Sequence, residues 1–185
     1  LFRSEARRFV VRHVEVPVLK PGTSPLRILH MSDLHLLARQ KAKREFIRQL
    51  AALKPDLVIN TGDNFCSADS LWPLLDDISG LLQRPGAFVL GSNDYLVPEF
   101  KNPFSYLLSG RSHQSDKPVL ELPHQELRQA FTSAGWLDLN DKSGTLEVAG
   151  RRLAFRGTDD AHHDRDHYEK VAGPADNDAD LNIEI

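Results

Sequence analysis

The chain has little of three features that would place a protein in a special class. Its single cysteine, Cys66, excludes an internal disulfide. No apolar run approaches the roughly 20 residues that a helix needs to span a bilayer. Basic and acidic residues nearly balance at 23 and 26, so the formal charge of -3 creates no field that would hold the whole chain on nucleic acid or on an anionic membrane. Any phosphate that the protein handles must therefore be bound locally, for instance by metal ions.

The rest of the composition is that of an ordinary domain. With 185 residues, of which 41% are hydrophobic and 26% charged, the chain is long enough for one domain with a real core. It begins at Leu1 without an initiator methionine, and residues 1–8 are basic. We therefore expect a soluble portion of a longer protein. The localisation of that parent stays open, and a membrane-associating segment can lie upstream of residue 1.

Apolar strands and amphipathic helices alternate through the first half of the chain. Short apolar runs at 26–31, 57–60 and 87–90 each end abruptly in polar residues, which is typical of buried strands. Between them, residues 41–53 and 71–82 carry apolar side chains at helical spacing. This alternation predicts right-handed crossovers and a parallel sheet, so the three polar ends should fall along one edge. We predict an α/β fold.

The second half of the chain is expected to contain loops as well as regular elements. The further segments are an edge strand at 9–18, a lid-like loop at 99–123, a helix at 125–134, a hairpin of strands 145–148 and 153–156, a loop at 158–180 and a strand that begins at 181–185. The His- and Asp-rich run at 162–167 fits no standard zinc motif, which favours a solvated loop. Because a strand precedes that run, Asp159, Asp160 and His162 are also candidates for lining a substrate cleft. We expect both tryptophans to pack in the interior.

The three polar strand ends carry residues that bind metal ions. Asp33 and His35 are separated by one residue, so in an extended loop both side chains point the same way and can meet one cation. Asp63 follows the second strand, and Asn93 follows the third. A carboxylate can bridge two ions about 4 Å apart, and Asp63 suits this role because its strand should lie between the other two. The competing interpretation, that these residues only form turns, would suit any one of them alone.

These strand ends also resemble a known family. The segments SDLH (32–35), TGDN (61–64) and LGSND (90–94) are similar to the first three motifs of the calcineurin-like metallophosphoesterases. The resemblance implies a layered β-sandwich flanked by helices and a site with two divalent ions, Mn, Zn or Fe. The metal ligands that it implies are Asp33, His35, Asp63 and Asn93. Asn64 is expected to support these ligands rather than to bind metal.

The third motif departs from the family pattern, in which a metal-binding Asn is followed by a catalytic His. Aligned without a gap, Asn93 stands at the position of that His, and Ser92 stands at the position of the ligand. Shifted by one residue, Asn93 is the ligand and Asp94 replaces the His. We favour the shift because an amide oxygen is a better ligand than a neutral hydroxyl. Asp94 then becomes the candidate proton donor, beside Asp63 as the second catalytic residue.

The later motifs of the family, a His after a fourth strand and a G-H-x-H, are absent from residues 1–185. We therefore expect residues 1–185 to be a single N-terminal portion of a metallophosphoesterase domain that ends before the C-terminal strands. As a portion, it would bind metal weakly and turn nothing over. The absence of these motifs also leaves room for a parent that kept the fold and lost catalysis.

Two functions are consistent with this pattern. The first is hydrolysis of phosphate mono- or diesters, or of pyrophosphates, by a metal-bound hydroxide. The alternative is a binding or regulatory domain of the same fold without turnover. The G-D-N motif and the strand before residues 158–160 resemble a branch with membrane-associated phosphoesterases and hydrolases of UDP-diacylglucosamine type. This implies a phosphorylated small molecule or a lipid-linked substrate, whereas a nucleic acid is not expected because a nuclease would carry a basic groove.

Overall fold

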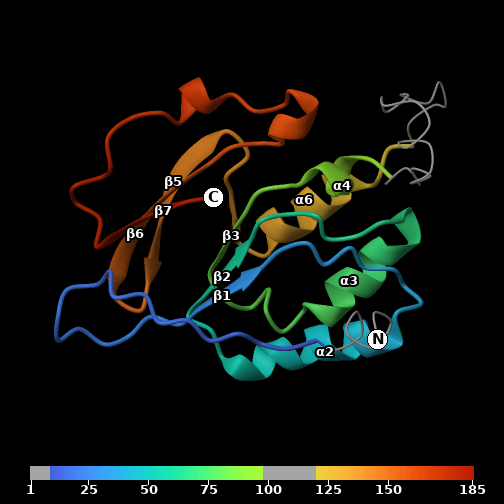
Figure 1. The fold of residues 1–185 in the computed structure, drawn as a ribbon, viewed down its shortest axis with the longest axis horizontal. Coiled ribbons are helices and arrows are strands. Elements are labelled where there is room, and N and C mark those ends of the chain that lie inside the picture. The colour runs from blue at the N-terminus through green and yellow to red at the C-terminus, as the bar shows by residue number, and fades with distance from the viewer. Residues whose placement is uncertain (1–8, 98–119) are drawn as a thin grey trace, which may run out of the picture.

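A parallel sheet carries the three polar strand ends. The computed structural model describes residues 9–97 and 120–185. Its first sheet contains β1 (Ile28–Met31), β2 (Leu57–Asn60), β3 (Gly86–Phe88) and β4 (Leu137–Asp138), in that order and all parallel (Figure 1). The three strands expected from the apolar runs are confirmed. Because neighbouring strands are parallel, the carboxyl ends of β1, β2 and β3 lie at one edge of the sheet.

Helices connect these strands. The helical elements of the first half and of the connection to β4 are α2 (Lys41–Gln49), its 3-10 continuation η1 (Leu50–Leu53), η2 (Ala68–Ser70), α3 (Leu71–Asp77), α4 (Ser92–Tyr95) and α6 (His124–Ser133). The η1 turn ends where Lys54 adopts a φ of 48° before Pro55, a residue without the N–H that would continue the helix. The helix expected over 71–82 ends at Asp77, and the chain continues in turns up to β3.

Two carboxylates fasten these helices in place. Asp77 of α3 is fully buried and accepts a hydrogen bond from Nε of Arg44 in α2 at 2.6 Å. Asp138 of β4 accepts from Nε of Arg128 in α6 at 3.0 Å and from Nζ of Lys142 at 2.6 Å. The first ion pair thus joins α2 to α3, and the others join α6 and the residue Lys142 to β4.

The second sheet is a hairpin extended by the C-terminal strand. It contains β5 (Lys142–Val148), β6 (Arg151–Gly157) and β7 (Leu181–Glu184), with β5 antiparallel and β7 parallel to the central β6. The two residues at the tip of the hairpin, Ala149 and Gly150, have φ values of 51° and 72°. Such left-handed pairs are favoured between two strands because they match the twist of the hairpin. The expected hairpin and final strand are confirmed.

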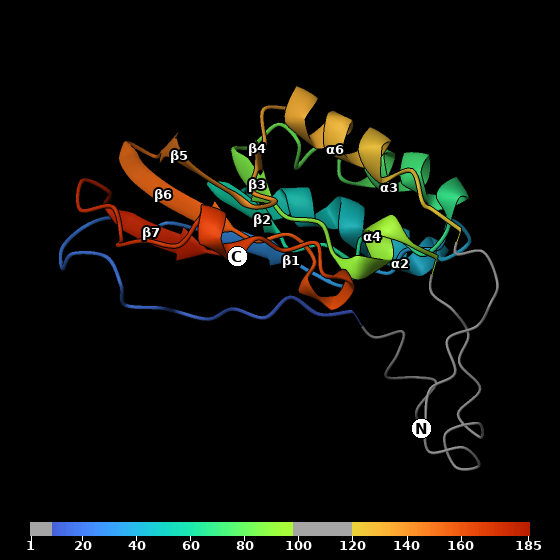
Figure 2. The ribbon, with the colours of Figure 1, turned by 90° about the horizontal axis from the view of Figure 1, so that it is seen from above.

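Apolar side chains form two cores, one on each face of the first sheet. On one face, Val58 of β2 packs in a cluster with Ile47 of α2 and Phe131 of α6. On the other face, Ile59 of β2 packs in a cluster with Leu153 of β6. Successive residues of β2 thus serve opposite cores, which is why Leu57, Val58 and Ile59 are all apolar. Figure 2 shows the resulting layers, with α3 and α6 on one side of the first sheet and the second sheet on the other. The α/β class is confirmed.

The periphery differs from the sequence expectations at two places. Residues 9–18 do not form a strand, because their backbone pairs with no other segment that the structure describes, and Val14 is 79% exposed. Trp72 is 72% exposed, so the expectation that both tryptophans are interior is wrong for it.

Residues 99–119 of the lid-like loop expected at 99–123 lie outside the residues that the structure describes. In the stretch 158–180, the structure has a loop with two short 3-10 turns, η3 (Ala161–His163) and η4 (Tyr168–Lys170). None of the helices in 9–97 and 120–185 is long and apolar enough to cross a bilayer.

Candidate functional site

The loops that follow β1 and β2 run side by side beyond the strand ends. The backbone N–H of Asp33 donates to the carbonyl of Gly62 at 3.1 Å. Two residues later, the N–H of His35 donates to the carbonyl of Asp63 at 2.8 Å. The parallel pairing of the strands therefore continues into the loops. This pairing brings together three of the four side chains that the sequence singles out as metal ligands.

All three of these residues have left-handed backbones. The φ values are 54° at Asp33, 40° at His35 and 56° at Asp63. For residues with a side chain this conformation costs of the order of 1 kcal/mol or more, and such strain collects at functional sites. The surrounding hydrogen bonds impose it here. As a consequence, the three polar side chains point toward one place. In a regular strand, successive side chains would instead alternate between the two faces of the sheet.

The three side chains form a compact donor group. The Nε2 atom of His35 lies 3.6 Å from Oδ1 of Asp33 and 3.5 Å from Oδ2 of Asp63. One ligand atom from each of the three residues lies within 4.8 Å of the others. The side chains of Asp33 and His35 are 67% and 39% exposed, whereas that of Asp63 is 18% exposed. The group thus opens to solvent on the β1 side and is closed behind Asp63.

Two glycines allow the loop after β3 to reach this group. A Cβ atom on Gly62 would overlap the backbone nitrogen of Gly91 and lie 2.7 Å from its Cα. A Cβ atom on Gly91 would in turn overlap Oδ1 of Asp63 and lie 2.8 Å from its backbone nitrogen. Gly62 also has a φ of 87°, which side chains other than that of glycine rarely accept. The two loops can touch only because both positions lack a side chain.

This approach places Asn93 against Asp63. The backbone N–H of Asn93 donates to Oδ1 of Asp63 at 2.9 Å, and its amide nitrogen lies 2.7 Å from Oδ2. Ser92 points elsewhere, because its hydroxyl donates to Oδ1 of Asp160 at 2.8 Å. Of the two residues that the sequence offered for this position, the structure brings Asn93 to the cluster. Metal binding by Asn93 stays a prediction.

Asp94 lies behind the cluster and is fully buried. Its carboxylate accepts hydrogen bonds from the backbone N–H groups of Asp63 at 2.9 Å, Asn64 at 2.7 Å and Gly91 at 3.0 Å. Burial raises the pKa of Asp94 to about 6, although the hydrogen bonds from Gly91 and Asn64 act in the other direction. In this position the carboxylate joins the loops after β2 and β3 and does not reach the open side of the site. Its role as proton donor stays a prediction.

Asn64 is also buried behind the ligands. Its side-chain oxygen accepts from the amide of Asn60 at 2.7 Å, and its own amide donates to Oδ1 of Asn60 at 3.1 Å and to Oδ2 of Asp94 at 3.1 Å. The same Asn60 oxygen also accepts from the N–H of Gly62 at 3.0 Å. This network holds the turn that carries Asp63.

The loop after β6 meets the loop after β3. Besides the Ser92 contact to Asp160, the hydroxyl of Tyr95 donates to Oδ1 of Asp159 at 2.6 Å. His162 contributes its backbone N–H, which donates to Oδ1 of Asp160 at 2.9 Å. The structure therefore brings Asp159 and Asp160 beside α4. Contact of these residues with a substrate stays a prediction.

The comparison with known families agrees with this arrangement. The sequence model of the calcineurin-like phosphoesterases matches residues 26–178. The chain belongs to the calcineurin-like phosphoesterase family. A comparison with curated proteins finds no significant match. The match begins just before β1 and includes all of the candidate ligands, so the family predicted from the sequence is confirmed.

The donor set fits the divalent metals that calcineurin-like phosphoesterases use. Asp33 and Asp63 offer hard carboxylate oxygens, and His35 offers an imidazole nitrogen. A mixed set of carboxylate and imidazole suits Mn²⁺, Fe²⁺ and Zn²⁺.

The sequence did not indicate one neighbour of the group formed by Asp33, His35 and Asp63, namely Cys66. The Sγ atom of Cys66 lies 3.6 Å from Nδ1 of His35, the ring nitrogen opposite Nε2. Burial raises the pKa of the Cys66 thiol, so it is present as S–H at neutral pH. A group bonded to the far nitrogen of a ligand histidine sets the orientation of the ring. Only the position of Cys66, three residues after Asp63, could have suggested this contact.

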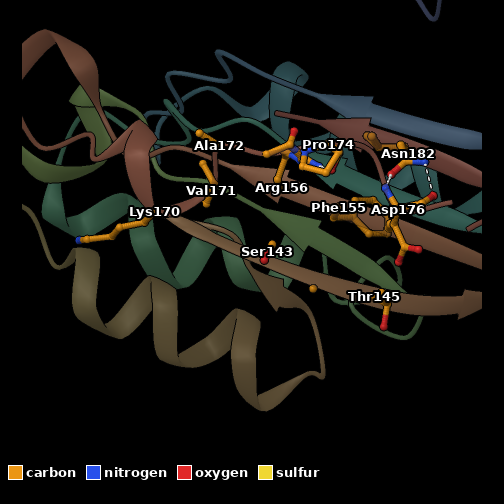
Figure 3. A pocket seen from close by; sticks show the side chains of 14 residues that line it. Ser143, Thr145, Phe155, Arg156, Lys170, Val171, Ala172, Pro174, Asp176 and Asn182 are labelled. Carbon is orange, nitrogen blue, oxygen red and sulfur yellow. Dashed lines mark hydrogen bonds between the residues drawn. The ribbon is translucent and has the colours of Figure 1, made fainter. Parts of the chain in front are cut away.

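A pocket of about 340 Å³ lies at the second sheet (Figure 3). It is formed by β5, β6 and β7 together with residues 170–176. The guanidinium of Arg156 in this pocket donates to the carbonyls of Gly173 and Pro174 at 2.7 and 2.6 Å. The guanidinium of Arg156 is therefore already bound to the loop of residues 170–176. The pocket contains none of the candidate metal ligands.

Proposed function

We propose that the protein is a metal-dependent hydrolase of phosphate mono- or diesters, including pyrophosphates, that works with two divalent ions. The observation that supports this most is the compact group of Asp33, His35 and Asp63 at the ends of adjacent strands. Its donors match the metals of the family to which the chain belongs.

Asp63 is the proposed bridge between the two ions. Asp33 and His35 would hold one ion together with Asp63, and Asn93 would hold the other together with Asp63. When bound, the ions supply positive charge for the phosphate oxygens and activate water. Supporting this assignment, Asp63 is the least exposed of the three donors, and Asn93 lies against it.

The remaining polar residues around the site would keep these donors in position. Asp94 holds the backbone of Asp63 and Gly91, and Cys66 contacts the ring of His35. Preorganised donors of this kind stabilise the charge of a phosphoryl transfer without reorganisation during the reaction.

The test is hydrolysis of bis-p-nitrophenyl phosphate and p-nitrophenyl phosphate by the full-length protein with Mn²⁺. Exchange of Asp63 for Asn should lower kcat/KM by at least about 100-fold, because charge stabilisation of this kind contributes factors of this size. Asp178→Asn, the same exchange at an exposed loop position, is the control and should leave kcat/KM unchanged. Equal activity of Asp63→Asn and the wild-type protein would refute the assignment.

For the substrate we propose a phosphorylated small molecule or a lipid-linked phosphate ester or pyrophosphate. A charge of -3 and the absence of a basic excess speak against nucleic acid. A panel of monoesters, diesters and pyrophosphates, each with and without an acyl chain, would measure this preference. A higher kcat/KM for DNA or RNA than for every other member of the panel would contradict it.

A binding or regulatory domain without turnover is the second candidate. It is favoured by one observation, namely that Tyr95 and Asp94, rather than a histidine, follow Asn93 in the third motif. This alternative predicts that the full-length protein purified with Mn²⁺ contains no metal at Asp33, His35 and Asp63. Anomalous scattering from two ions at these residues would exclude it.

A further inference from the structure

A buried carboxylate in the loop after β6 holds a histidine next to α4. Asp160 is 8% exposed and accepts hydrogen bonds from Ser92 at Oδ1 and from the ring of His163 at Oδ2. The contact between Nδ1 of His163 and Oδ2 of Asp160 is 2.6 Å long, which is short for a bond of this type. An acceptor at this position places a proton on Nδ1 and leaves Nε2 as the second functional nitrogen. The His163 side chain is 36% exposed.

This loop is fastened at two further points. The hydroxyl of Tyr95 donates to Asp159, and the guanidinium of Arg165 lies 4.2 Å from the centre of the Tyr95 ring. Asp141, which directly precedes β5, accepts from the backbone N–H of Asp159 at 3.1 Å and from the backbone N–H of His167 at 2.8 Å. The segment around His163 is thus fixed to α4 and to the second sheet, as a segment that must place a reactive group should be.

The same contacts link the loop of His163 to the candidate metal cluster. Ser92, which bonds to Asp160, is followed by Asn93, and consecutive Cα atoms are only about 3.8 Å apart. Asn93 in turn contacts both carboxylate oxygens of Asp63. Asp160 therefore joins the loop of His163 to the segment that carries Asn93. Among the residues that the structure describes, Nε2 of His163 has no hydrogen-bond partner.

We infer that His163, oriented by Asp160, is the catalytic residue that protonates the leaving group of the phosphate ester. This rests on the proposed hydrolase activity and names the proton donor for it. In the step, the oxygen of water forms a bond to phosphorus and releases a proton to solvent, while the bond from phosphorus to the leaving oxygen breaks. The ring of His163, which begins the step with a proton on each nitrogen, passes the proton on Nε2 to the leaving oxygen, so that an alcohol departs. His163 is left neutral and takes up a proton from solvent before the next turnover.

A purely structural role for the pair would have different consequences from a catalytic one. A general acid matters when the leaving group is a poor one, and little when the leaving group departs readily as an anion. A structural tie that holds the loop would affect both kinds of substrate to the same extent. The dependence of the loss on the leaving group therefore separates the two roles.

The experiment compares matched p-nitrophenyl and 2-phenylethyl esters, as phosphomonoesters and as methyl phosphodiesters, with the full-length protein and Mn²⁺. His163→Gln should lower kcat/KM for the 2-phenylethyl ester by about 100-fold or more, and for the p-nitrophenyl ester by less than about 3-fold. Asp160→Asn should show the same selectivity with a smaller loss. His13→Gln, at an exposed position of the N-terminal segment, is the control and should change neither value.

The outcomes separate this inference from the proposed function. If activity depends on Asp63 but His163→Gln lowers both esters equally, or neither, the inference is wrong while the hydrolase assignment stands. If no ester is hydrolysed in an Asp63-dependent manner, both are wrong. His163→Asn serves in the same comparison if the Gln variant has a changed circular dichroism spectrum.

A second readout needs no catalysis. In the metal-free protein, NMR of the ring nitrogens of His163 should show a proton on Nδ1 that is protected from exchange by its bond to Asp160. Asp160→Asn should remove this protection, and His13→Gln should not. A His163 ring that carries its proton on Nε2 alone, without protection at Nδ1, would overturn the inference.

Discussion

Alanine at Gly62 should destabilise the protein far more than alanine at Gly135, although the two glycines share a φ of 87°. A Cβ atom at Gly135 meets no atom within 4 Å, whereas one at Gly62 overlaps the backbone nitrogen of Gly91 and lies 2.8 Å from the carbonyl carbon of Leu90. The left-handed conformation costs alanine about 1–2 kcal/mol at either position. Overlap with backbone atoms, which cannot rotate away, adds about 1–3 kcal/mol at Gly62.

Urea unfolding of both variants measures the difference. We expect a loss of about 1–2 kcal/mol for Gly135→Ala and of about 2–5 kcal/mol for Gly62→Ala. Calorimetric titration with Mn²⁺ should show weaker binding only for Gly62→Ala, since its Cβ atom would separate the loop of Asp63 from that of Asn93. Equal losses of stability in the two variants would refute the close approach of these loops.

Three other variants test the surroundings of the site and the frame. Cys66→Ala should weaken Mn²⁺ binding by about 10-fold, because the ring of His35 loses its neighbour; calorimetry with Cys66→Ser as control measures this. Asp77→Ala should cost about 3 kcal/mol in urea unfolding, because Arg44 is left without its buried partner, and a loss below about 1 kcal/mol would contradict this. Burial would raise the pKa of Asp138, but hydrogen bonds from its neighbours outweigh it and lower the pKa to about 2. Because this folded-state pKa lies below the ordinary value of 3.8, the carboxylate's contribution is present above pH 4 and is lost as the pH falls toward 2. Its size is at most about 2 kcal/mol, and Asp138→Asn should flatten the stability curve across that range.

The parallel sheet and the three-residue cluster could be predicted because their signals are local. Each strand is a short apolar run followed at once by polar residues, and alternation with helices makes the strands parallel. Once the strands are parallel, their ends must share an edge. Asp33, His35 and Asp63 then come together without any knowledge of side-chain packing.

Features that depend on distant contacts could not be predicted in this way. Residues 9–18 have the composition of a strand, yet a strand also needs a partner, and no local pattern says whether one is present. The run at 162–167, which includes His163, reads as a solvated loop until the bond between Ser92 and Asp160, 68 residues apart, places it beside α4. The apolar stripe of 71–82 correctly indicates buried residues. It does not say whether Trp72 is buried or exposed, and Trp72 is exposed.

Asp94 is the residue to which the sequence and the structure assign different roles. The sequence favours a proton donor, because in the shifted alignment Asp94 replaces the catalytic histidine of the family. The structure favours a positioning role, because its buried carboxylate holds the backbone N–H groups of Asp63 and Gly91.

The ratio of kcat/KM for p-nitrophenyl and 2-phenylethyl esters decides between these roles. In Asp94→Asn an NH₂ group replaces one of two accepting oxygens, so at least one N–H donor in the loops loses its acceptor and Asp63 shifts. Both esters should then be hydrolysed more slowly by the same factor, and the ratio should stay constant, whereas His163→Gln should change it by about 100-fold. If instead Asp94→Asn alone changes the ratio, Asp94 is the proton donor, and the bond between His163 and Asp160 serves only to hold the loop.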